Sequence, residues 1–397
     1  MQSARRLSGP LLAALALSLA ATTGFAQGTG RSLDIDHSIR AAGMGEASNA
    51  VMWGDELNQW SNPAVLGYVR GVHYEYGNTQ LVPGLAADVF FRSNVLKLGG
   101  GGLGTYFAGK PFGLGGVKLD YGESVATDPN GNPIGTFGSF EQIDSWGFGV
   151  SLARTFESVA RLTEHQPPRI SRVADVSVGM GFKSIDVSLF PGFEGSTSTL
   201  DRGLLVRVSP LEIAQASRDL PLAFDLSYGW SELSYDGATI TFPFPGVPEP
   251  LSHHRREGYA GHIAVVIPSE MRRRMEEHPA GWFLTGLDPL LSFGYAKDHD
   301  EITPSSGDFK TDGSGTEISV ANIYSFRTGH FEDPLGEING DTEGWSVGLP
   351  IGHVAAVRYD HATIPQASNS GLPDVTREAW SGWFDALRLW KMWKGGR

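Results

Sequence analysis

Hydrophobic and polar residues alternate with a period of two along most of the chain, and this period indicates β-strands whose two faces meet different surroundings. Between Leu222 and Trp230, every even-numbered position is apolar or aromatic and every odd-numbered position is small or acidic. Similar alternation occurs in 146–153 and 176–182. Weaker versions are found in 72–76, 117–121, 204–208, 261–267, 291–295, 318–326 and 345–349. The pattern predicts an all-β protein built from antiparallel strands.

The composition of the two faces favours a transmembrane β-barrel. Aromatic and aliphatic residues share one face, while the other face carries mainly Gly, Ser, Ala and Asp. A barrel strand crosses a membrane with about 9–11 residues, and several of these segments reach that length with their flanks. A soluble β-sandwich or propeller also alternates and is the other interpretation of the pattern. We expect about 14 strands, about 12 of which are readable directly, with 96–116 as the place for a further pair.

The N-terminus has the features of an export signal. Arg5 and Arg6 precede the apolar run 11–21, and small residues at 24–26 come before a plausible cleavage point at Gln27. The run is too short for a membrane-spanning helix, which needs about 20 residues. We therefore expect residues 1–26 to be a signal peptide; a retained anchor is the alternative. The chain has no cysteine, which excludes both a lipid-modified N-terminus and a disulfide framework.

Charge and composition limit the classes of partner that the protein can bind. Residues 1–26 hold two of the 31 basic residues and none of the 44 acidic ones, so the mature net charge is 29 − 44 = −15. An acidic protein gains nothing from polyanions, and we expect no nucleic-acid partner. After the signal, no apolar run is long enough for a spanning helix, so a membrane protein of this composition has to be a barrel. The 52 glycines fit a barrel, where strands curve and lumenal side chains are small.

The connections between predicted strands are of two kinds, which suggests an orientation. The segments 128–133, 242–254 and 298–316 are polar and rich in Gly, Pro or Asp. Bacterial barrels carry their longer loops outside, so we expect these at the cell exterior. The segments 155–165, 210–218 and 268–278 resemble short amphipathic helices, which we expect at the periplasmic rim.

The C-terminal segment permits two interpretations. Tryptophan and leucine residues at 380, 383, 387 and 390 have helical spacing, and tryptophan with lysine and arginine suits a membrane interface. Alternatively, Val375 to Phe384 is the last strand and 388–397 is an amphipathic tail. We favour the second interpretation because a bacterial barrel needs an even number of strands.

Two regions resemble a known family. The segment from Ala41-Ala-Gly-Met-Gly45 to Asn62-Pro-Ala64 is similar to the N-terminal region of FadL-type long-chain fatty-acid transport porins, and more so of their PorV-type relatives. The segments 324–330, 344–349 and 357–365 resemble the C-terminal strands of PorV-type barrels. Outer-membrane barrels usually end on an aromatic residue of the last strand, whereas this chain continues beyond its aromatic residues to Arg397.

The resemblance implies a 14-stranded barrel, at 71–387, whose N-terminal segment 27–70 folds inward as a hatch. It assigns six residues to the hatch and its junction with the first strand: Gly43, Met44, Gly45, Asn62, Pro63 and Ala64. Proline fixes φ and removes a donor, which suits the point where the hatch turns into strand one. The other interpretation is that Asn-Pro-Ala caps a short helix.

Enzymatic patterns occur but lack their structural context. Gly344 to Gly348 matches G-x-S-x-G, which functions only at a sharp strand-to-helix turn, yet β-type alternation continues on both sides. The glycines of 99–104 match a dinucleotide fingerprint, but strand-like residues follow. We expect 298–301 and 253–254 to be solvated loop residues without a metal. No enzyme activity, cofactor or metal is expected.

Two functions remain for an outer-membrane protein of a diderm bacterium in contact with membrane lipid. The first is passage of hydrophobic small molecules, which requires an apolar lumen near the hatch; of the adjacent Phe90 and Phe91, one has to point inward. The alternative is a PorV-like docking or shuttle barrel for exported proteins. Its affinity would lie in an outer loop with Phe242, Phe244 and Val247. We favour transport; the sequence does not identify the substrate or cargo, or the oligomeric state.

Overall fold

The computed structural model describes most of the chain after the predicted export signal, which lies outside the described residues. The described ranges are 30–128, 130–162, 169–213, 221–243, 246, 248–277, 279–303, 308–334, 336–367, 370–386 and 388–390. Among these residues, no helix is both long and apolar enough to span a membrane.

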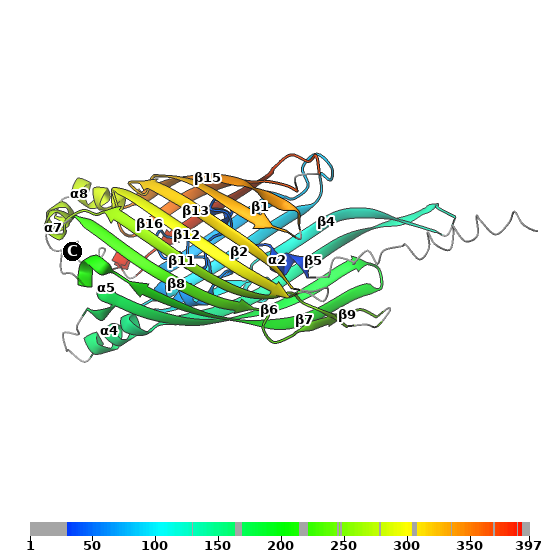
Figure 1. The fold of residues 1–397 in the computed structure, drawn as a ribbon, viewed down its shortest axis with the longest axis horizontal. Helices are drawn as coiled ribbons and strands as arrows, with labels where there is room; N and C mark the ends of the chain where they lie inside the picture. The colour runs from blue at the N-terminus through cyan, green and yellow to red at the C-terminus, as the bar shows by residue number, and fades with distance from the viewer. Residues whose placement is uncertain are drawn as a thin grey trace, which may run out of the picture.

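The strands form one antiparallel sheet that closes on itself as a barrel (Figure 1). Strand β1 pairs with β2 on one side and with the last strand, β17, on the other, which closes the ring. The sheet contains 15 strand segments, but β3 and β4 both lie between β2 and β5, so the barrel has 14 strand positions. The predicted fold class is therefore confirmed, and 96–116 does contain a further antiparallel pair, formed by the end of β2 and by β3.

The barrel strands are β1 (Gly71–Gln80), β2 (Phe90–Gly100), β3 (Leu103–Ala108), β4 (Gly116–Thr127), β5 (Pro133–Ser151), β6 (Ala174–Phe190), β7 (Phe193–Val208), β8 (Leu222–Leu233), β11 (His253–Val265), β12 (Leu291–Thr303), β13 (Phe309–Val320), β14 (Tyr324–Asp333), β15 (Ile338–Ile351), β16 (Ala355–Ile364) and β17 (Val375–Phe384). The short strands β9 (Thr239–Thr241) and β10 (Pro248–Pro250) form a separate hairpin between β8 and β11.

Short helices gather at one end of the barrel, which we call the helical rim. Figure 1 shows them at the same end as the C-terminal segment, while the β4–β5 hairpin extends furthest at the opposite end, the hairpin rim. The helices between barrel strands are α4 (Leu152–Leu162), α5 (Ile170–Val173), α6 (Pro210–Ile213), α7 (Ser269–Glu276), α8 (Pro279–Leu284) and the 3-10 helix η4 (Thr285–Leu287); another 3-10 helix, η2 (Lys110–Phe112), lies between β3 and β4. The helical segments predicted at 155–165, 210–218 and 268–278 thus correspond to α4, α6 and α7, which share the helical rim, whereas η2 lies along the wall.

Several predicted element boundaries differ from those in the structure. The segment 298–316 is mostly strand, since β12 continues to Thr303 and β13 begins at Phe309. The segment 318–326 is a hairpin and not one strand, because Ala321 and Asn322 adopt left-handed φ values of 55° and 54° between β13 and β14. The end of the predicted strand 146–153 is already helix α4.

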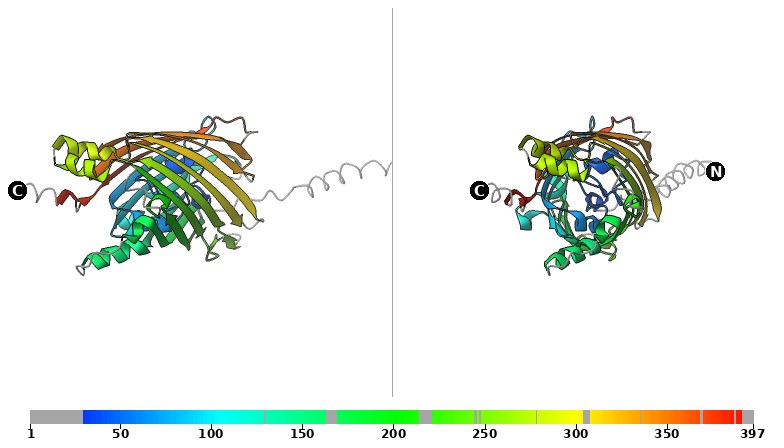
Figure 2. Two further views of the ribbon diagram at one scale, coloured as in Figure 1. Left: turned by 60° about the vertical axis from the view of Figure 1, so that its left-hand side comes forward. Right: turned by 90° about the vertical axis from the view of Figure 1, so that its left-hand side faces the viewer.

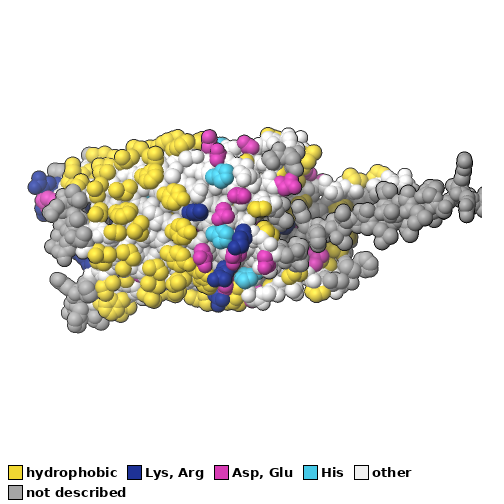
Figure 3. Space-filling model, in the orientation of Figure 1, with side chains coloured by type: hydrophobic (Ala, Val, Ile, Leu, Met, Phe, Trp, Pro, Cys, Tyr) yellow, Lys and Arg dark blue, Asp and Glu magenta, His cyan; other side chains and the backbone are white. Residues whose placement is uncertain are grey.

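The outer face of the barrel carries an apolar belt. Figure 3 shows hydrophobic side chains over the half of the barrel nearest the helical rim, followed by a band of charged and histidine side chains. On β12, the exposed Leu291, Phe293 and Tyr295 belong to the belt, and Lys297 lies beyond them. Apolar side chains facing outward all round a closed sheet are the arrangement that lipid requires, so the barrel spans a membrane.

Strand β17 shows which of the two interpretations of the C-terminal segment is correct. Residues Val375–Phe384 form the last barrel strand, and Phe384 pairs with Val72 of β1. The chain thus ends its barrel on an aromatic residue after all, and the helical interpretation of residues 380–384 is wrong. Most of the predicted tail, 391–397, lies outside the described residues.

Candidate functional site

The N-terminal segment fills the interior of the barrel. Seen along the barrel axis in Figure 2, residues coloured blue lie inside the ring of strands. This segment, residues 30–70, is called the hatch below; it contains the helices α2 (Arg31–Asp34) and α3 (Ile39–Gly43) and the 3-10 helix η1 (Pro63–Tyr68). Nearly all residues from 36 to 50 and from 57 to 69 are buried, so the hatch packs against the wall on every side.

Three of the predicted hatch residues lie against strands β13 to β15. Met44 is 1% exposed, and the backbone N–H of Gly45 donates to Thr342 Oγ1 at 2.9 Å. Gly45 has a φ of 65°, and a side chain there would overlap the carbonyl group of His330. Gly43 lies directly on Gly344 of β15. Glycine is therefore required here on both hatch and wall, because the two backbones touch.

Asn62, Pro63 and Ala64 begin η1 on the opposite side of the lumen. The Asn62 side-chain oxygen accepts from Ala64 N at 3.0 Å, while its amide nitrogen donates to the carbonyls of Asn49 and Leu204. Asn62 is thus a helix cap and also a link to β7. The prediction that Pro63 marks the turn into strand one is wrong, because η1 intervenes and β1 begins at Gly71.

A buried charge cluster joins the hatch to the wall. Arg40 of α3 donates to both oxygens of Glu317, from Nη2 at 2.7 Å and from Nε at 3.0 Å. Arg327 lies across from Glu317 on β14; it donates to Glu317 at 2.6 Å and to Asp360 at 2.6 Å. We call Arg40, Glu317, Arg327 and Asp360 the latch. The sequence analysis missed it, although charged residues on the small-residue face of strands were the available signal.

Two carboxylates of the segment 298–301 hold the hatch in place. Asp298 Oδ2 accepts from the backbone N–H groups of Ser48 and Asn49, each at 2.7 Å. Asp300 accepts from His254, whose other ring nitrogen lies 3.0 Å from Asp34. The expectation of solvated loop residues is wrong for these inward side chains, which lie on strands. No group of three or more ligating side chains within the described ranges could hold a metal ion.

An apolar cluster fills the lumen between the hatch and the hairpin rim. Phe91 points inward and is 3% exposed, whereas Phe90 lies beside Arg92 on the outer face. Phe242 is 1% exposed and stacks on Phe193 at 4.3 Å. We call this set the lumenal cluster; it contains Leu33, Trp60, Phe91, Val117, Leu119, Ile143, Ile185, Val187, Ile240, Phe242 and Leu251.

The burial of Phe242 argues against its predicted role in docking exported proteins. Its ring is packed within the barrel and is not available to a partner at the surface. Phe244 and Val247, the other two residues of the predicted docking loop, lie outside the described residues.

Between β3 and β4, the chain makes an outward excursion from the wall beside the lumenal cluster. The pairing of β2 passes from Leu96↔Phe107 in β3 directly to Asn94↔Gly116 in β4, and residues 109–115 leave the wall between them. This segment, the wall break, is largely exposed on the outside. Val117 and Ile143, which belong to the lumenal cluster, form the next cross-strand pair after the break.

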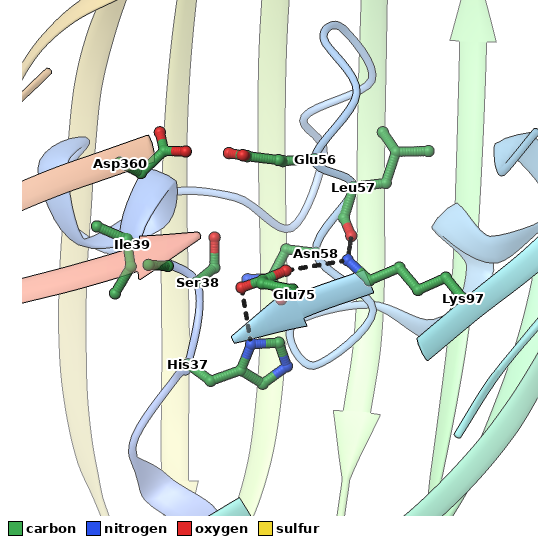
Figure 4. Close-up of a pocket in the computed structure, with 10 residues that line it drawn as sticks. His37, Ser38, Ile39, Glu56, Leu57, Asn58, Glu75, Lys97 and Asp360 are labelled. Atoms are coloured by element: carbon green, nitrogen blue, oxygen red, sulfur yellow. Dashed lines mark hydrogen bonds and ion pairs between the residues drawn. The ribbon is translucent and has the colours of Figure 1, made fainter. Parts of the chain in front are cut away.

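Two small cavities lie beside the hatch. Figure 4 shows one in which His37, Glu75 and Lys97 point toward each other. Lys97 Nζ donates to the carbonyl of Leu57 at 2.7 Å and lies 3.6 Å from Glu75. This cavity has a volume of about 10 Å³ and its neighbour about 20 Å³, so each has room for about one water molecule. A hydrophobic ligand does not fit in either of them.

The enzymatic patterns have structural explanations. Ser346 lies in the middle of β15 and is 1% exposed; its hydroxyl accepts from Arg327 of the latch at 3.2 Å. It is therefore not on a strand-to-helix turn. The glycines of 99–104 form the tight β2–β3 hairpin, and a side chain at Gly104 would overlap the Leu66 carbonyl of the hatch.

Comparisons with known proteins give distant structural similarity only. No protein-family model matches the chain. No curated protein matches it in sequence either. Among solved structures, the toluene transporter TbuX of Ralstonia pickettii is 12% identical, with 87% of this chain and 97% of that chain covered at a TM-score of 0.42. A FadL homologue of Pseudomonas aeruginosa is 8% identical (88% and 98% covered, TM-score 0.40). The toluene transporter TodX of Pseudomonas putida is 9% identical (86% and 96%, TM-score 0.38). Similarity at this level carries no argument about function.

Proposed function

We propose that this chain is an outer-membrane channel through which hydrophobic small molecules pass sideways from the lumen into the membrane. The observation that carries the proposal is the position of the lumenal cluster. It extends without interruption from the hatch residues Leu33 and Trp60 to Val117 and Ile143, which border the wall break. Apolar side chains lining a lumen are costly in an aqueous pore, and they suit a path for apolar molecules.

The entrance lies at the hairpin rim. The connection between β8 and β11 folds into the barrel, where Ile240, Phe242 and Leu251 complete the lumenal cluster from above. These three side chains come from one connection and occupy the place that an apolar ligand would take. A ligand therefore enters when the described parts of this connection, residues 234–243 and 248–252, move outward, and their side chains return when the ligand leaves.

The exit lies in the wall and not through the hatch. Below the lumenal cluster, the lumen is closed by the packed hatch and by buried charges, including Lys183, which pairs with Asp201 at 2.8 Å and lies over the ring of Trp60. On the outer face, Asn94 and Asp144 lie at the level of the wall break, and the apolar Leu96 and Trp146 follow toward the helical rim. The wall break thus lies at the edge of the apolar belt, and this is where we place the exit.

Placement in the outer membrane follows from the export signal predicted at 1–26 together with the barrel. Closed β-barrels with helix-free spans are the form that exported outer-membrane proteins take. With longer hairpins outside, the helical rim faces the periplasm, and the mature chain begins at Gln27 with the hatch and continues as the barrel from Gly71.

The register supplies a clean test of the exit. Deletion of 109–115 would join Ala108 to Gly116, and Val95 and Asn94 of β2 would then face them in unbroken order. On the other side, Ala108 keeps Ser145 and Val117 keeps Ile143. The deletion therefore closes the wall break without shifting any strand.

The measurement is transfer of a fluorescent long-chain fatty acid into proteoliposomes that contain the purified protein. We expect saturable transfer by the unaltered protein and a loss of at least about tenfold in the deletion variant, since each tenfold corresponds to only about 1.4 kcal/mol. Replacement of 109–115 by a Gly/Ser segment of equal length is the matched control and should restore transfer. Equal transfer by the deletion variant, or no saturable transfer by the unaltered protein, contradicts the proposal.

A further inference from the structure

Helix α4 carries its apolar side chains on the outside. Leu152, Phe156, Val159 and Leu162 are 54%, 56%, 56% and 84% exposed, although they follow one another at the spacing of a single helix face. On an ordinary surface helix, this face would be turned to the protein core. Exposed apolar faces of this kind mark a surface that meets a partner or a membrane.

The polar side of α4 holds the helix in this orientation. The guanidinium of Arg154 lies 4.4 Å from the ring of Tyr68 in the hatch. Glu157 is buried and accepts from the backbone N–H of Ser171 at 2.7 Å and from its hydroxyl at 2.9 Å. These contacts fix the helix to the barrel end and to α5. The helix cannot roll its apolar face inward without breaking them.

The apolar face continues the lipid-facing surface of the barrel. On β5, the exposed Trp146 and Phe148 belong to the apolar belt, and Leu152 is the next outward apolar residue toward the rim after Val150. Phe156 and Val159 extend the same surface beyond the end of the strand. Other connections at the helical rim repeat the feature, with exposed apolar side chains at Ile170, Ile213, Met271, Phe283 and Trp390.

We propose that α4 lies in the phospholipid leaflet at the helical rim, with Phe156 and Val159 inserted at the boundary of headgroups and acyl chains. The occupant of the exposed face is lipid because the face is continuous with the apolar belt, which lipid already covers. An amphipathic helix in this position buries its apolar face about 5–10 Å into the leaflet. The helix thus anchors the barrel at one membrane depth on the side of β5 and β6.

The absence of native cysteine makes the proposal directly testable. Single variants Phe156→Cys and Val159→Cys are labelled with an environment-sensitive fluorophore in phospholipid nanodiscs. Arg161→Cys, on the opposite side of α4 where the side chain is 66% exposed, is the matched control. Each labelled protein is checked for the mobility shift between unheated and boiled samples, so that only folded barrels are compared. Quenching is then measured with a spin label on the lipid acyl chain and with aqueous iodide.

We expect the lipid-borne quencher to act severalfold more strongly at 156 and 159 than at 161, and iodide to show the reverse order. Equal access of iodide to all three positions would overturn the proposal. Protection at 156 and 159 without quenching by the spin-labelled lipid would also overturn it, because a second copy of the chain or another protein would then cover the face.

Discussion

At the scale of single residues, the hatch is held by charged side chains that are buried away from the protein surface. Arg40 brings one positive charge from the hatch to Glu317, and Arg327 and Asp360 complete the latch from the wall; all are at most 4% exposed. A buried ion pair adds little net stability over an apolar contact, but removal of one partner leaves an uncompensated charge and is costly. The latch therefore specifies one docked position of the hatch.

Removal of the hatch side of the latch should release the hatch. Arg40→Ala leaves Glu317 with Arg327 as its one cationic partner within the latch and also frees the carbonyl of Trp53, to which Arg40 donates at 2.6 Å. We expect a loss of about 3–5 kcal/mol in the free energy of hatch docking. Hydrogen exchange of residues 39–50 would show this as faster exchange while the barrel strands stay protected. Arg388→Ala, at a half-exposed position outside the barrel, is the control. Unchanged protection of 39–50 would show that the latch does not hold the hatch.

Hatch docking should also weaken as the pH rises. Burial raises the pKa of the Glu46 carboxyl to about 7, with the Arg377 guanidinium at 3.3 Å opposing the shift. A carboxyl with a raised pKa in the docked state favours docking at low pH and loses this contribution between its ordinary pKa of 4.5 and about 7. We expect protection of residues 44–48 to fall by up to about tenfold per pH unit in that window. Glu46→Gln should remove this dependence; an unchanged profile would exclude Glu46 as its source.

The residue scale also shows where sequence reasoning reaches its limit. The inward position of Gly179 was predictable from the alternation along β6, and Pro63 was assigned to the hatch by resemblance. Their contact was not predictable, because a side chain at Gly179 would overlap the Pro63 carbonyl only once the hatch has folded into the lumen. Local periodicity gives the face of a strand, while the partner on that face depends on residues far away in sequence.

At the scale of elements, strand identity was predictable and strand ends were not. The alternation in Leu222 to Trp230 marks β8 because lipid and lumen select different residues on its two faces. Beyond the apolar belt, both faces are polar, so β12 continues to Thr303 through residues that read as a loop. The wall break at 109–115 was not predictable either, because glycine occurs both in barrel turns and at lumenal positions of strands.

The connection above the lumenal cluster should act as a lid. Phe242→Ala removes its stacking on Phe193 and part of the cover of the cluster. We expect faster association of a fluorescent fatty acid, by severalfold, with a smaller change in the dissociation constant, as measured by stopped-flow fluorescence. Phe190→Ala is the matched control, because Phe190 stacks on the same Phe193 at 4.8 Å but is 48% exposed and lies outside the cluster. Equal effects of the two substitutions would contradict a lid role for residues 234–243 and 248–252.

At the scale of the whole molecule, two solvents determine the arrangement of the chain. Lipid selects the apolar belt on the outside, and the hatch and the lumenal cluster fill the inside of the described barrel. A closed sheet of this kind resists detergent until heated. We expect unheated protein to migrate differently from boiled protein on a denaturing gel, and a protein that is soluble without detergent and shows no shift would not be a membrane barrel.

The most direct test of the account is photo-crosslinking of the reconstituted protein with a diazirine-labelled long-chain fatty acid, followed by peptide mapping. Lipid contact alone labels the apolar belt, including the strands that carry Trp146 and Phe293. The account predicts further adducts on the lumenal cluster, at peptides containing Phe91 and Phe242, and predicts that excess unlabelled fatty acid removes these adducts. Labelling confined to the outer belt, with no competable adducts in the lumen, would contradict passage of hydrophobic molecules through this barrel.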